Sequence, residues 1–78
     1  METKFVMIYK NNNMAYTKKF PSQEQAKMHV SNHILELCNF YNRMGRKYEL
    51  TYHDNTRVLM LTDTMETMSW TIEERSDD

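Results

Sequence analysis

The spacing of hydrophobic and polar residues changes twice along this chain, from strand-like to helical and back. Apolar side chains occupy both parities of residues 3–10 and mainly one parity of residues 14–20, and three Asn residues separate the two segments. Asn tolerates turn conformations, so this pattern predicts an N-terminal β-hairpin. Residues 47–53, 57–62 and 68–74 again read as strands. The predicted order is ββαβββ.

Residues 22–44 carry the helical pattern. Ser22 is a suitable N-cap, and Gln25 follows three residues later as in a capping box. Gly45 is the expected C-terminal stop, since glycine adopts the left-handed conformation that ends many helices. The apolar residues predicted to face the core recur every three or four positions: Ala26, Val30, Ile34, Leu37, Tyr41 and Met44.

The C-terminal strands differ in their alternation. In 47–53, Tyr48, Leu50 and Tyr52 share one face, whereas 57–62 is apolar on both parities, as in a central strand. Asp54 and Asn55 supply a hairpin turn, and residues 63–67 form a polar loop. The last strand, 68–74, places three side chains inward: Met68, Trp70 and Ile72.

These elements predict an α+β fold in which one amphipathic helix packs on an antiparallel sheet. We expect a single domain over residues 1–75 and a frayed acidic end at 76–78. One helix covers only one sheet face, yet the first and fourth strands are apolar on both faces. Their second faces carry Val6, Ile8, Val58 and Met60. We therefore expect part of the sheet to contact a second copy of the chain or a partner protein.

Composition limits the compartment and the stabilising interactions that we expect for this chain. The chain has 78 residues and one cysteine, Cys38, so it forms no internal disulfide. It contains no apolar run near the roughly 18 residues of a membrane span and no secretory leader pattern, which indicates a cytoplasmic protein without membrane contact. A domain this small often gains stability from a partner, so homodimer formation or binding to another protein is expected.

Charge is divided along the chain. Residues 1–57 carry nine Lys or Arg against five acids, a net of +4, and residues 58–78 carry one Arg against six acids, a net of −5. Such a charge asymmetry is informative about what the protein binds and not about how it folds. We expect an acidic partner-binding face formed by Asp63, Glu66, Glu73 and Glu74. A solubilising acidic tail is the alternative.

The basic residues suggest a second kind of surface. Lys18 and Lys19 end the second strand, and Arg43, Arg46 and Lys47 surround the end of the helix. If these five converge, with Tyr16, Tyr41 and Tyr48 between them, they provide the cations and stacking rings of an RNA- or DNA-binding face. Cationic capping of the helix end is the ordinary alternative.

No residue pattern indicates catalysis. His29 and His33 have the spacing of two metal ligands on one helical turn, but no third ligand is placed beside them, and half-buried histidines at the core margin are the expected reading. Cys38 has no adjacent base and reads as a small core-margin residue. With one glycine, the chain has no phosphate-binding loop. We expect no enzyme activity, metal, cofactor or small-molecule substrate.

Two exposed apolar residues remain. Met28 and Leu35 project opposite the predicted core stripe of the helix, beside Asn32, Asn39 and Asn42. They are either incidental surface residues or a contact patch.

In style the chain resembles small early proteins of tailed bacteriophages, being short, rich in Met and Asn, and poor in Gly. Residues 58–72 more narrowly resemble two neighbouring strands of the phage uracil-DNA glycosylase inhibitor: Val58 to Thr62, an acidic turn, and Trp70-Thr71-Ile72. The hairpin before them is basic here, whereas the inhibitor has an acidic strand. The resemblance implies a phage protein that blocks a host enzyme, and phage antagonists of toxin ribonucleases are a second such group.

The expected function is therefore binding and inhibition of a host defence or nucleic-acid-processing enzyme, such as a toxin ribonuclease or a DNA-repair enzyme, in the host cytoplasm. The alternatives are a small RNA- or DNA-binding protein that uses the basic residues and a structural, homodimeric assembly protein.

Overall fold

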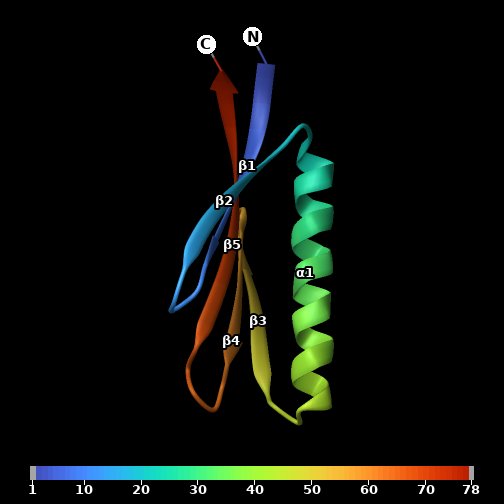
Figure 1. Cartoon of the computed structure of the whole chain (residues 1–78), viewed down its shortest axis with the longest axis vertical. Coiled ribbons are helices and arrows are strands. Elements are labelled where there is room, and N and C mark those ends of the chain that lie inside the picture. The colour runs from blue at the N-terminus through green and yellow to red at the C-terminus, as the bar shows by residue number, and fades with distance from the viewer. Residues whose placement is uncertain (1, 78) are drawn as a thin grey trace.

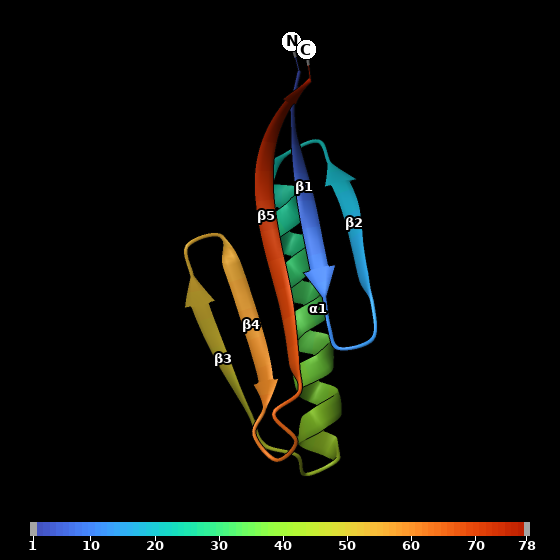
Figure 2. The ribbon, with the colours of Figure 1, turned by 90° about the vertical axis from the view of Figure 1, so that its left-hand side faces the viewer.

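The computed structural model describes residues 2–77 and has one helix on one face of a five-stranded antiparallel sheet (Figure 1). The elements are β1 (Glu2–Lys10), β2 (Ala15–Phe20), α1 (Gln23–Arg43), β3 (Tyr48–His53), β4 (Thr56–Leu61) and β5 (Thr67–Asp77). The sheet order is β2-β1-β5-β4-β3, so the first and last strands pair at its centre (Figure 2). The predicted α+β class and ββαβββ order are confirmed.

Both ends of α1 form as the sequence predicts. The Ser22 hydroxyl accepts a hydrogen bond from the Gln25 backbone N–H at 3.2 Å, which satisfies one of the free donors of the first turn. Gly45 has φ = 71°, and the N–H groups of Gly45 and Arg46 donate to the carbonyls of Asn42 and Tyr41. This pair of bonds is a Schellman motif, which requires a left-handed residue at the glycine position.

The core lies between α1 and the middle of the sheet. Ala26, Val30 and Ile34 are the buried helix residues, and they meet Met7 and Tyr9 from β1. Strands β4 and β5 complete the cluster with Leu59, Leu61, Met68, Trp70 and Ile72. Trp70 is fully buried and lies at the centre of this layer. The inward direction predicted for the β5 side chains is confirmed.

The opposite face of the sheet has no covering layer within the described residues (Figure 2). Its apolar residues are Val6, Ile8, Val58 and Met60, as the sequence indicated. These four side chains are less exposed to solvent than an uncovered sheet face would suggest. Val6 is only 3% accessible, and the other three are half-buried. Strand register explains this, since Ile8 stands between Thr17 and Thr71 and side chains of adjacent strands shield one another.

Three details differ from the expectations. Met44, placed at the end of the core stripe, is the C-cap residue and is 55% exposed, because α1 stops one residue before it. Tyr52 is 65% exposed, whereas α1 contacts β3 at the start of the strand, where the Tyr48 hydroxyl donates to Asn42 Oδ1 at 3.2 Å. Strand β5 runs to Asp77, where a frayed end was expected from residue 76, because it pairs with the start of β1. Asp78 lies outside the described residues.

Within residues 2–77, no helix is both long enough and apolar enough to cross a membrane.

Candidate functional site

The four acidic residues expected to form one partner-binding face do not lie together. Asp63 is in the β4–β5 loop and accepts two hydrogen bonds from the Arg46 guanidinium, at 2.9 and 3.3 Å. Glu66 belongs to the same loop, at one end of the molecule. Glu73 lies on β5, and its Oε2 forms an ion pair with Arg75 Nη2 at 2.8 Å. Glu74 points to the other face of that strand. The single acidic face is therefore wrong, because strand alternation and the length of β5 separate its members.

The five basic residues do not converge either. Lys18 and Lys19 lie near the end of β2 that leads into the start of α1, whereas Arg43, Arg46 and Lys47 surround its far end. A helix of 21 residues spans about 30 Å, so the two groups are at opposite ends of the molecule. Arg46 is further occupied by Asp63, and this contact lowers the pKa of the Asp63 carboxyl. The predicted convergence is wrong, and nucleic-acid binding by either group stays a prediction.

The outer side of α1 is exposed as expected. Met28 is 64% and Leu35 59% accessible, and both project away from the sheet. Phe40 adds a third exposed apolar side chain, which stacks edge-on against Tyr41 with ring centroids 5.5 Å apart. These three residues do not form a hollow with one another. A shallow hollow on the same part of the helix is lined by polar residues instead: Glu36, Asn39, Asn42 and Arg43.

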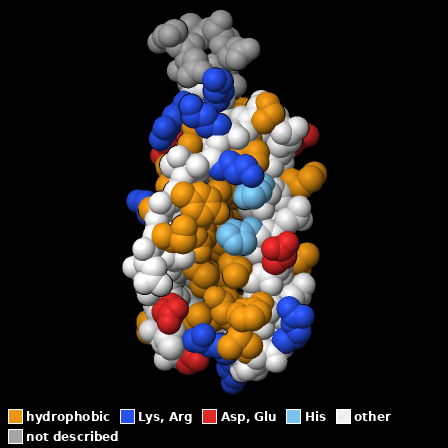
Figure 3. Space-filling view, in the orientation of Figure 1, with side chains coloured by type: hydrophobic (Ala, Val, Ile, Leu, Met, Phe, Trp, Pro, Cys, Tyr) orange, Lys and Arg blue, Asp and Glu red, His pale blue; other side chains and the backbone are white. Residues whose placement is uncertain are grey.

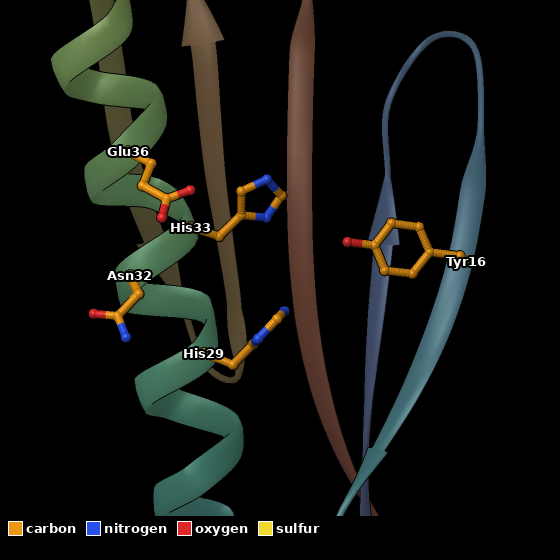
Figure 4. Close-up of a pocket in the computed structure, with 5 residues that line it drawn as sticks. All are labelled: Tyr16, His29, Asn32, His33 and Glu36. Carbon is orange, nitrogen blue, oxygen red and sulfur yellow. The ribbon is translucent and has the colours of Figure 1, made fainter.

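A groove between β2 and α1 does combine apolar and polar groups. We call it the β2–α1 groove; its lining residues are Tyr16, His29, Asn32, His33 and Glu36. The rings of His29 and His33 project from α1 toward β2, and Tyr16 projects toward them from the strand (Figure 4). Its volume is about 210 Å³. Small-molecule pockets are commonly about 300–1,000 Å³, so the groove suits a side chain better than a whole metabolite.

Buried aromatic rings pack behind the residues that line the groove. Tyr9 contacts Tyr16, His33 and Trp70, with ring centroids 5.1, 5.4 and 5.3 Å away. Next to Tyr9 a second hollow of about 270 Å³ continues along the helix, past Leu37 and Tyr41. In the space-filling view a strip of hydrophobic side chains runs beside the two histidines (Figure 3). The aromatic contacts hold this strip rigid, as offset and tilted rings pack well at such distances.

His33 has a defined hydrogen-bonding role. The buried indole Nε1–H of Trp70 donates to its Nδ1 at 3.0 Å, and the two rings meet edge-on at 86°. A neutral histidine that accepts at Nδ1 carries its proton on Nε2. His33 therefore offers a donor, not a free lone pair, to anything else that approaches it. Within residues 2–77, no three His, Cys, Asp or Glu side chains are arranged to hold a metal ion.

His29 lies at the β2 end of α1, against the ring of Phe20 at 5.2 Å. Its pKa is lowered from 6.5 by partial burial first, then by the charge of Lys18 and by His33, while Glu36 acts in the opposite direction. His29 is thus mainly neutral at neutral pH. The Lys18 ammonium lies 5.6 Å from the Phe20 ring centroid. In the described part of the chain no acidic side chain pairs with Lys18.

Strand β2 is an open edge of the sheet beside this groove. It pairs with β1 on one side and is the first strand in the sheet order. The Asn11 N–H donates to the Met14 carbonyl at the turn between β1 and β2. Because hydrogen-bonded and non-hydrogen-bonded residue pairs alternate along two antiparallel strands, this bond fixes which residues of β2 bond to β1. By alternation, Ala15, Thr17 and Lys19 direct their backbone N–H and C=O groups outward. Their neighbours Tyr16, Lys18 and Phe20 point to the helix side.

Sequence reasoning had identified His29 and His33 only as core-margin residues and Tyr16 only as a stacking ring between cations. The missing information was the strand order. Because β1 lies between β2 and β5, Tyr9 contacts both Tyr16 and Trp70, and Trp70 reaches His33, 37 residues away in sequence. The inward position of Trp70 was the one available signal, since a buried indole N–H needs an acceptor.

Comparison of the chain with protein-family models, with curated proteins and with solved structures gave no match.

Proposed function

We propose that this chain is a non-enzymatic binding protein that inhibits a host enzyme through direct protein–protein contact. The observation that supports this best is the β2–α1 groove, where aromatic lining residues, ring N–H and hydroxyl donors, and an open strand edge occur together. Such a combination is typical of surfaces that receive a segment of another protein.

The class of target rests on the resemblance to small phage inhibitors alone. It points to a host defence or nucleic-acid-processing enzyme, such as a toxin ribonuclease or a DNA-repair enzyme. The acidic residues do not supply the contact as one face, because Asp63 and Glu73 are each paired with an arginine of the same chain. The groove replaces them as the proposed contact.

A tagged pull-down from host lysate, with and without nuclease, tests the proposal. We expect one host protein to be retained after nuclease treatment and its activity to fall when the purified chain is added in stoichiometric amount. Loss of every retained protein on nuclease treatment would instead favour the RNA- or DNA-binding alternative. Retention of the chain itself as the sole partner, with a dimer seen by light scattering, would favour the homodimeric assembly alternative.

A further inference from the structure

The outer edge of β2 and the β2–α1 groove together have the form of a site for an added strand. Three residues of β2 present outward backbone groups, and the residues between them face the helix side, where Tyr16 lines the groove. A polypeptide that pairs with this edge places alternate side chains beside Tyr16 and His33, and the others beside Thr17 on the uncovered face. The partner's backbone supplies affinity, and the hollow selects a side chain.

Charge on the edge determines what kind of strand fits. Lys18 points to the groove side and Lys19 to the uncovered face, and neither has an ion-pair partner in the described part of the chain. Lysines on an edge strand disfavour pairing with a second copy of the same edge. Opposite charges directly across two strands stabilise the pair. The edge is therefore complementary to a strand that carries carboxylates on both of its faces.

The groove adds an apolar requirement. Two of its lining residues, Tyr16 and His33, pack against the buried ring of Tyr9, so the groove offers aromatic surface together with N–H and hydroxyl donors. Glu36 lines the groove beyond His33 along α1, and its charge disfavours a carboxylate there. An apolar or aromatic side chain near Tyr16, followed two residues later by a carboxylate near Lys18, satisfies both conditions.

We propose that β2 binds an extended acidic segment of the partner protein by strand addition, with one apolar side chain in the β2–α1 groove. This inference rests on the proposed function and names the chemistry of the contact. The alternative edge, β3, differs in charge: its one fully charged residue is Glu49, so the strand offers no cation to a segment of carboxylates.

The test uses a fluorescent peptide of about six residues, the length of an average strand. One of its faces carries Phe followed two residues later by Glu, and its other face carries a further Glu. Its anisotropy should rise on addition of the chain, and the same peptide with Lys in place of Glu should not bind. Reversing both edge charges, with Lys18→Glu and Lys19→Glu, should weaken binding about tenfold, from two cross-strand pairs. The matched control Arg43→Glu with Lys47→Glu changes charge equally at the far end and should bind as the unmodified chain does.

A backbone variant tests strand addition separately from charge. Thr17→Pro removes one outward N–H, whereas Thr17→Val keeps it and changes the side chain alone, so only the proline variant should lose the peptide. Trp70 fluorescence confirms that each variant is folded. Equal binding by Thr17→Pro and Thr17→Val, or by the two peptides, would overturn the proposal.

The lysate experiment separates this inference from the proposed function. If the edge variants still retain the host protein that the unmodified chain retains, strand addition is wrong and inhibition by another surface stands. If the unmodified chain retains no protein after nuclease, the proposed function itself fails. A concentration-dependent dimer that Thr17→Pro abolishes, without peptide binding, would also overturn the proposal in favour of a second copy.

Discussion

Replacing His33 by leucine removes the acceptor that satisfies the buried indole of Trp70. The indole is fully buried, and its Nε1–H to Nδ1 distance of 3.0 Å is that of a normal hydrogen bond. In His33→Leu the donor loses its acceptor inside the core, which costs about 1–3 kcal/mol. For a domain of this size that is a large part of a total stability of about 4–12 kcal/mol. Glutamine keeps a side-chain acceptor, so His33→Gln should be less destabilising than His33→Leu.

Urea denaturation followed by fluorescence measures this effect directly, because Trp70 is the only tryptophan. The midpoint should fall by about 1–3 M urea in His33→Leu, given a slope near 1 kcal/mol per M for small proteins. The control is His29→Leu. His29 is also half-buried and lies one helical turn earlier, but it makes no hydrogen bond with Trp70. Equal midpoints for the leucine variants at positions 29 and 33 at pH 8 would refute the reasoning.

Three further predictions concern the helix end, the core and pH. Gly45→Ala should cost about 1 kcal/mol by thermal denaturation, from backbone strain at φ = 71° alone, since no atom lies within 4 Å of the added Cβ. Leu59→Ala, at a fully buried position of β4, should cost about 2–5 kcal/mol and lower the urea midpoint without loss of secondary structure by circular dichroism. Folding lowers the pKa of His29, so the unfolded chain binds more protons as pH falls through 6.5 and the free energy of unfolding should decrease there. Lys18→Gln should raise the His29 pKa measured by NMR titration; an unchanged value would exclude the lysine as a cause.

The candidate site could be predicted only in fragments. The helical period placed His29 and His33 on one flank of α1, and alternation placed Trp70 inward, both from local spacing. Their contacts with Tyr9 and Tyr16 depend on which strands are neighbours, and no local pattern specifies that order. The grouping of acidic residues failed for a different reason, because strand alternation was not applied to it: Glu73 and Glu74 are adjacent in sequence but lie on opposite faces of β5.

The sequence by itself determined the elements, because caps, turns and hydrophobic periods act over a few residues. Ser22 and Gly45 bound the helix, and the Asp54–Asn55 turn joins β3 to β4 as expected. Only the tertiary structure decided that β1 and β5 pair at the centre, which leaves β2 as an open edge beside α1. Strand order follows from the global fit of one helix over the most apolar strands. It is a balance of many weak long-range contacts, whereas each element depends on strong short-range ones.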